Sequence, residues 1–149
     1  MLAIALGVAT LGCASTAASE RSAIHAWEMR ARVERTAIGQ SAARAHAILG
    51  RDPVHKPGHP AEPFPSPRRE LSLRTPAGES VRVELYVVDA RNAEGCPDVH
   101  YEDVPVVFID DVVVARDWES VEARWRGWGG SLDLLRDARD GHQCPYPRP

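Results

Sequence analysis

The stretch that decides the fold is Val104-Pro105-Val106-Val107-Phe108-Ile109-Asp110-Asp111-Val112-Val113-Val114-Ala115-Arg116. Two runs rich in β-branched residues flank a pair of aspartates, a pattern that predicts two strands joined by a tight turn at Asp110-Asp111. Because both runs are apolar almost without interruption, we expect strands that are central in a sheet or covered on both faces. The sequence therefore predicts a β-hairpin in a small sheet.

A second hairpin is expected upstream of the first. Residues 70–74 alternate between polar and apolar side chains, residues 76–79 favour a turn, and residues 81–87 alternate again. The side chains predicted on its inward face are Val81, Val83, Leu85 and Val87. An acidic loop from Asp89 to Asp103 would connect the two hairpins.

Two helices are expected before the sheet. Residues 19–35 contain neither Gly nor Pro and are rich in helix-forming residues. The next helix would begin after an N-cap at Ser41, run through Leu49 and end at Gly50. The predicted apolar stripes are Ile24, Trp27 and Ala31 on the first helix and Ala42, Ala45, Ile48 and Leu49 on the second. A Pro-rich extended loop over residues 53–68 follows.

These elements predict an α+β fold, with two N-terminal helices packed on a three- or four-stranded antiparallel sheet and short C-terminal helices. A sheet this small needs its apolar face covered, and the two stripes are the nearest apolar surfaces able to do so. We expect residues 20–118 to form this domain. Residues 119–149 would hold a Trp-bearing helix and a tail, with a last short helix over residues 131–139.

An aromatic stripe marks the start of the C-terminal region. Its members, at helical spacings of three, four and three, are Trp118, Val121, Trp125 and Trp128. Packing against the chain's own sheet is one interpretation. A partner groove or a membrane boundary is the other, since aromatic side chains dominate interface energetics and are enriched at membrane surfaces.

The first 19 residues carry no charge and include an apolar run that is too short to span a bilayer. Small residues precede Cys13 and small polar residues follow it, an arrangement that resembles a bacterial lipobox. We expect residues 1–12 to be a lipoprotein signal peptide, Cys13 to be lipidated and residues 13–19 to form a tether. A non-lipid secretory signal or a buried N-terminal strand are the alternatives.

Two further cysteines, Cys96 and Cys144, form an even pair. In an oxidising compartment such a pair is a disulfide candidate, and a bridge across their 48-residue separation would stabilise the fold by roughly 4 kcal/mol. The alternative is two unpaired thiols in loops.

A family resemblance rests on the order of several short motifs. Ile38-Gly39-Gln40-Ser41, then Leu49-Gly50 and Pro53, are followed by Leu85-Tyr86-Val87 and by residues 106–113. This order resembles small bacterial envelope lipoproteins of the SmpA/OmlA type, the group that includes BamE. The resemblance implies a helical pair on a small antiparallel sheet, a lipid anchor at the cell envelope and, as for the BamE members, a role in assembling outer-membrane β-barrels. Because Ala14 and Ser15 after Cys13 provide no acidic retention signal, we expect the anchor in the outer membrane, facing the periplasm.

Composition and spacing exclude or weaken other classes. A formal net charge of −3 argues against a nucleic-acid binder. His55 and His59 are four residues apart, but Pro57 and Gly58 prevent the helix that would align them; His100 stands in the acidic loop. We therefore expect no metal or other cofactor, and a non-enzymatic interaction module or assembly accessory with an envelope protein partner. The alternative is a small periplasmic metal-binding protein or enzyme that uses one of these histidines.

Overall fold

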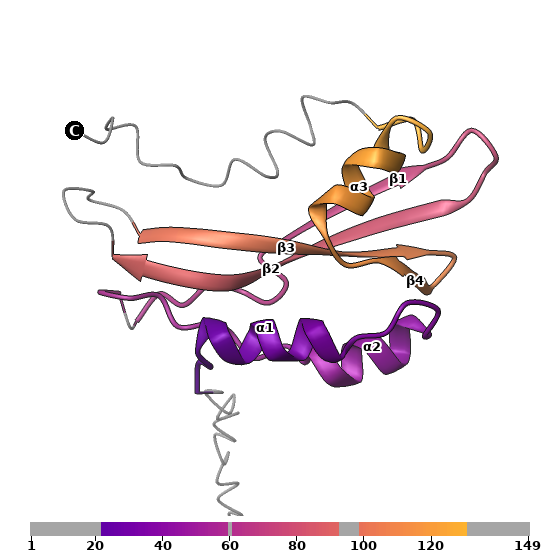
Figure 1. Ribbon diagram of the computed structural model, residues 1–149. Coiled ribbons are helices and arrows are strands. Elements are labelled where there is room, and N and C mark those ends of the chain that lie inside the picture. Colours follow the sequence, from indigo (N-terminus) through magenta and orange to yellow (C-terminus); the bar gives the residue numbers. More distant parts are fainter. Residues whose placement is uncertain (1–21, 60, 93–98, 131–149) are drawn as a thin grey trace, which may run out of the picture.

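The computed structural model describes residues 22–59, 61–92 and 99–130 of the 149. Within them it contains three helices and a four-stranded antiparallel sheet, which confirms the predicted α+β class (Figure 1). Cys13, Cys96 and Cys144 lie outside the described residues, as does the helix predicted over residues 131–139.

The elements follow the chain in the order α1 (Ala26–Arg35), α2 (Ala42–Leu49), β1 (Arg69–Arg74), β2 (Ser80–Asn92), β3 (Val99–Ile109), β4 (Val112–Ala115) and α3 (Trp118–Trp125). The strands are adjacent in sequence order, β1-β2-β3-β4, and each pair is antiparallel. Helices α1 and α2 lie on one side of this sheet and α3 lies on the other (Figure 1).

The predicted turn between β3 and β4 is present. Asp110 and Asp111 adopt left-handed conformations with φ of 46° and 61°, and short polar side chains tolerate such conformations better than branched ones do. The Asp110 carboxylate accepts a hydrogen bond of 3.2 Å from the Ser80 N–H, which links this turn to the start of β2.

Strand β4 is an outer strand of the sheet rather than a central one. Its outer side is paired with the α1–α2 linker, where the Gly39 N–H donates to the Val113 carbonyl (2.8 Å) and the Val113 N–H donates to the Gln40 carbonyl (2.9 Å). The Ala42 N–H donates in turn to the Asp111 carbonyl (2.7 Å). The linker therefore satisfies backbone groups that would otherwise lie open at this edge.

Both faces of the sheet are covered, which corrects the expectation of a single apolar face. Val83, Leu85 and Val107 pack with α3, whereas Val106 and Phe108 pack with α1 and α2. Helices α1 and α2 thus cover the face of the β1–β2 hairpin opposite to the one predicted, and α3 covers the face of Val81, Val83 and Leu85. Val87 also differs from prediction: it joins the α1–α2 side, next to a register shift between Val87 and Asp89.

Helix α1 starts later than predicted, at Ala26. Ile24, two residues before the helix, forms a parallel bridge with Val54, its N–H donating to the Pro53 carbonyl (2.9 Å) and its carbonyl accepting from the His55 N–H (2.7 Å). These bonds hold the backbone extended before the helix. The predicted stripe is wrong as well, because Trp27 is 68% exposed and the buried residues of α1 are Met29 and Val33.

The boundaries predicted for helix α2, after Ser41 and at Leu49, are confirmed. The Ser41 side chain accepts a hydrogen bond from the Arg44 N–H at its start, and Gly50 ends it with φ of 69°. Arg32 of α1 reaches this end and donates to the Leu49 carbonyl (3.0 Å) and to the Asp52 carboxylate (2.8 Å). The Gly50 backbone, with φ of 69° and ψ of −171°, lies in a region that side chains with a Cβ rarely adopt, so this position favours glycine.

The acidic loop predicted over residues 89–103 is largely strand. Residues 89–92 pair with residues 99–102, which extends β2 and β3 beyond their apolar segments. Asp103 is buried in β3, where its Oδ2 accepts from Arg68 Nε (2.8 Å) and Nη2. Burial raises the pKa of Asp103 above its ordinary value, and Arg68 offsets part of that effect.

The aromatic stripe is core. Val121, Trp125 and Trp128 are buried against the sheet, and Trp118, partly buried, donates through Nε1 to the Asp103 carbonyl (2.8 Å). This is the packing interpretation of the stripe, in which Val121, Trp125 and Trp128 are buried and Trp118 remains partly exposed. Because α3 packs on the same sheet, the boundary predicted between residues 118 and 119 falls within one packed unit.

Removing the Trp125 side chain should therefore destabilise the fold. We expect Trp125→Ala to lower the free energy of unfolding by about 3–5 kcal/mol, as truncation of buried aromatic side chains does. Denaturant unfolding measures this free energy. The matched control is Trp27→Ala at an exposed position, whose free energy of unfolding should lie within about 0.5 kcal/mol of that of the parent. Equal stability of the two variants would contradict the core assignment.

Candidate interaction surface

The most exposed large apolar side chain of the described residues, Trp27, stands at the rim of a cavity of about 370 Å³. The cavity lies between the start of α1, the Pro-rich loop at His55 and strand β2 at Asp89. The His25 ring stacks on Trp27, with centroids 6.2 Å apart and planes 13° apart, and lies 5.9 Å from the His55 ring. Three rings from two segments thus form one wall.

A second cavity of about 320 Å³ lies farther along α1. Its lining includes Val33 of α1, Val104 of β3 and Trp118 at the start of α3. Arg30 and Val88 line both cavities, so the two are neighbours. We call the two cavities together with Trp27 the α1 surface.

Charges of both signs border the apolar floor of the α1 surface. Arg30 Nη2 lies 3.2 Å from Glu102 Oε2 at the junction of the cavities, with both side chains about half exposed. Arg116 donates to the Glu34 carbonyl, which ties the end of the sheet to α1. An exposed aromatic residue, an arginine and an apolar floor within a polar rim are the usual components of a protein-binding surface.

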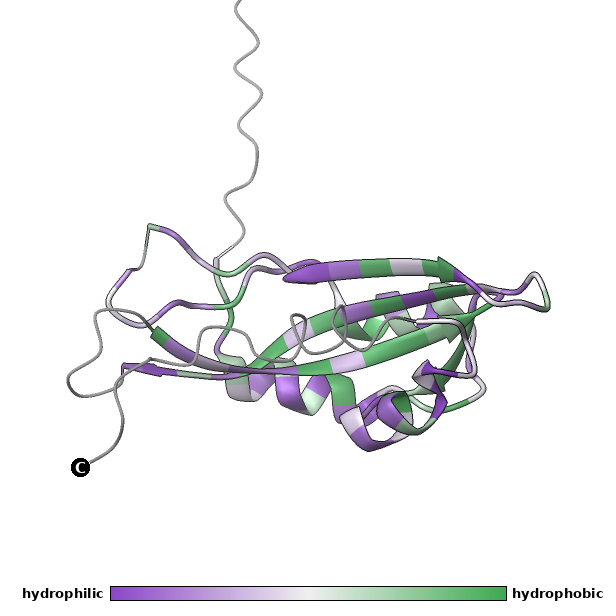
Figure 2. Ribbon diagram, turned by 90° about the horizontal axis from the view of Figure 1, so that it is seen from above, coloured by the Kyte–Doolittle hydropathy of each residue, from purple (hydrophilic) through white to green (hydrophobic). Residues whose placement is uncertain are grey.

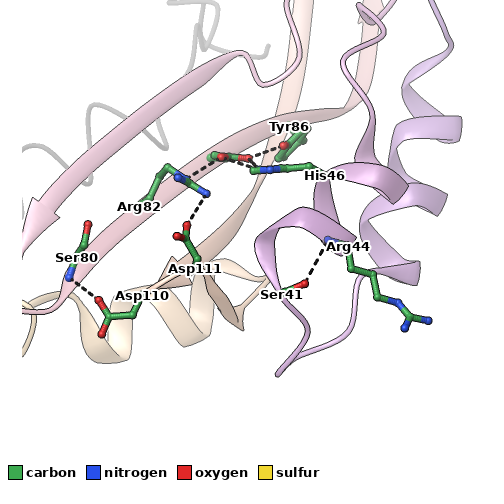
Figure 3. Close-up of polar contacts among 9 residues, drawn as sticks. Ser41, Arg44, His46, Ser80, Arg82, Tyr86, Asp110 and Asp111 are labelled. Carbon is green, nitrogen blue, oxygen red and sulfur yellow. Dashed lines mark hydrogen bonds and ion pairs between the residues drawn. The ribbon is translucent and has the colours of Figure 1, made fainter.

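A separate polar network, centred on a buried carboxylate, lies between α2 and the sheet (Figure 3). The Glu84 side chain is only 4% exposed, and both its oxygens lie 3.0 Å from His46 Nε2. The Tyr86 hydroxyl donates to Glu84 Oε2 (2.6 Å), and Arg82 Nε lies 3.0 Å from Glu84 Oε1. Arg82 also reaches Asp111 in the β3–β4 turn (3.5 Å).

This network connects α2 to the sheet through one carboxylate. Each Glu84 oxygen already has two polar neighbours, so the charge is compensated where burial would otherwise make it costly. The His46 ring and the Arg82 guanidinium also lie against Phe108. The two ring centroids are 5.2 Å apart, and Arg82 Cζ lies 4.9 Å from the Phe108 centroid. We interpret the network as structural, because no oxygen of Glu84 is left for a substrate.

The structure does not combine the predicted histidines into a metal site. His55 and His59 lie in the Pro-rich loop, and His100 on β3 is paired across the sheet with Arg91. Within residues 22–59, 61–92 and 99–130, no three His, Cys, Asp or Glu side chains are grouped so that they could hold a metal ion.

The sequence did not identify Trp27 as exposed or Glu84 as buried. Trp27 was expected to face the core, although the buried Met29 and Val33, four residues apart, give the alternative stripe. Glu84 was missed because alternation in a half-exposed hairpin places it on the polar face. The nearby Tyr86 on the same face was the available signal that this face is covered too.

No family model, curated protein or solved structure matches this chain. The resemblance to the SmpA/OmlA type therefore remains a prediction from its motifs. Among the helices of the described residues, none has the length and apolar character needed to cross a membrane.

The Glu84 network predicts a specific alkaline sensitivity. Burial, followed by the charge and hydrogen bond of Glu84, raises the pKa of Tyr86 above its ordinary value. Below about pH 10 the phenol keeps its proton in both folded and unfolded chains, so its stabilisation is fully present. Above that pH the unfolded chain loses the proton first, and stability should fall by up to about 1.4 kcal/mol per pH unit until the folded-state pKa is reached.

Chemical unfolding of the parent and of Tyr86→Phe between pH 8 and about pH 11.5 measures this effect, with the other tyrosines common to both proteins. We expect the parent to lose stability more steeply than the variant above about pH 10. Parallel curves would contradict the assigned role of Tyr86.

Proposed function

We propose that this protein is a non-enzymatic cell-envelope lipoprotein that acts as a protein-interaction module or assembly accessory, as the SmpA/OmlA resemblance implies. The observation that carries the proposal is the 68% exposure of Trp27 beside the α1 surface. A large aromatic side chain left in water costs free energy that a partner can recover by covering it.

The position of Trp27 agrees with a tethered protein. Residues 13–19 would connect the lipid at Cys13 to the domain, and α1 begins only a few residues later, at Ala26. The α1 surface would then lie close to the point of attachment. Tethering confines the protein to the membrane and raises its local concentration there, so a modest contact surface suffices for a partner in the same membrane.

The partner we infer is another envelope protein, reached from the periplasmic face of the outer membrane. Recognition would place an apolar group of the partner over the floor formed by Val33, Val88 and Val104. The charged rim of Arg30 and Glu102 would supply polar contacts around it. Such an arrangement selects a partner by shape and charge without any chemical step.

The proposal predicts that Trp27 is required for partner capture. In crosslinked cells, we expect Trp27→Ala to reduce the recovered partner by about thirty-fold, the loss typical of a hot-spot aromatic. The matched control is Ile38→Ala, since Ile38 is 58% exposed but lies in the α1–α2 linker, outside the α1 surface. Quantitative mass spectrometry of the captured proteins gives the result; equal recovery with both variants would overturn the role of Trp27.

The proposed lipid anchor at Cys13 leads to a separate prediction about where the protein is found. Cys13→Ser should move the protein from the membrane fraction to the soluble fraction and remove the mass of the acyl groups, because lipid attachment requires the thiol. Fractionation with intact-mass measurement checks this. A parent protein that carries an unmodified Met1 would contradict the lipoprotein assignment while leaving the α1 surface to be judged by its own variant.

A further inference from the structure

The two outer edges of the sheet differ. The α1–α2 linker pairs with β4, as described above, whereas within the described residues the outer edge of β1 has no β-bridge and no backbone hydrogen bond to another segment. Alternate residues of an outer strand direct their N–H and C=O groups away from the sheet, where they can pair with a further strand. Figure 2 shows β1 along this open margin.

The sequence of β1 is complementary to itself. It reads Arg69-Glu70-Leu71-Ser72-Leu73-Arg74. If a second copy is placed antiparallel with Ser72 opposite Ser72, then Glu70 lies opposite Arg74 and Leu71 lies opposite Leu73. Each of these pairs occurs twice, once on either side of the two-fold axis.

We propose that β1 pairs with β1 of a second copy of this chain in this register, so that two four-stranded sheets join into one of eight strands. A two-fold interface of this kind uses the same patch on both subunits, and a self-complementary strand meets that requirement. The inference is independent of the lipid anchor and of the α1 surface.

The charged side chains of β1 support a partner at this edge. Glu70 and Arg74 are exposed, and neither forms an ion pair with any described residue. In its own sheet Glu70 lies opposite Glu84, a like charge, and Arg82, which is diagonal to it, already contacts Glu84 and Asp111. Arg74 of the second copy would give Glu70 an opposite charge directly across the strand pair.

The apolar side chains of β1 support the same partner. Leu71 and Leu73 face the α3 side, where they pack on the cluster of Val81, Val83 and Trp125 but remain partly exposed. Pairing two copies places these leucines side by side and continues the apolar face across the two-fold axis.

Charge reversal tests the proposal on the full-length chain, kept reduced, by sedimentation over a range of concentrations. We expect a dimer whose dissociation constant rises about ten-fold or more in Glu70→Arg, because two attractive cross-strand pairs become repulsive. Glu70→Arg combined with Arg74→Glu restores opposite charges in both pairs and should return the dissociation constant to that of the parent. Neither residue is part of the α1 surface, so partner capture is unaffected.

A crosslink tests the register independently of charge. With the three native cysteines replaced by serine, Ser72→Cys places two thiols opposite each other at the two-fold axis, with Cβ atoms about 5 Å apart. We expect rapid disulfide-linked dimers on oxidation, and none from the control Glu119→Cys on the exposed side of α3. A monomer at every concentration overturns the proposal, as does a dimer that ignores charge reversal or fails to crosslink at Ser72.

Discussion

Consecutive buried residues in the central strands are the constraint on which the rest of the structure depends. Val106, Val107 and Phe108 are all buried, and because neighbouring side chains of a strand point to opposite faces, no single layer can cover them. The sheet therefore needs helices on both sides. The arrangement of α1 and α2 against α3 is the direct consequence, and it explains why the tryptophans of α3 belong to the core.

Local chemistry was sufficient to predict several elements. Asp110-Asp111 between two β-branched runs indicated a turn because few other residues accept left-handed conformations. Ser41 and Gly50 bounded α2 because an N-cap hydroxyl and a glycine stop act through the neighbouring backbone alone. The α+β class followed from the order of these elements along the chain.

Features set by distant segments were not predictable in the same way. Ile24 is kept out of α1 by hydrogen bonds to the Pro-rich loop thirty residues away, and propensity contains no information about that pairing. Strands β2 and β3 extend through polar residues because each supplies the other's backbone partners. For the candidate surface, the error at Trp27 came from the same source, because Ile24, which defined the predicted stripe, lies outside the helix and α1 buries Met29 and Val33 instead.

The pairing of the α1–α2 linker with β4 limits how further chains can add to this sheet. A sheet with two open margins can add chains without end and form a fibre, which is the hazard of any unprotected edge. Here residues 39–42 of the chain's own α1–α2 linker pair with β4, so the backbone edge of that strand is not open to a second molecule. The proposed β1–β1 pairing would use the edge of the other outer strand in the same way, so neither β1 nor β4 of the dimer would accept a further strand.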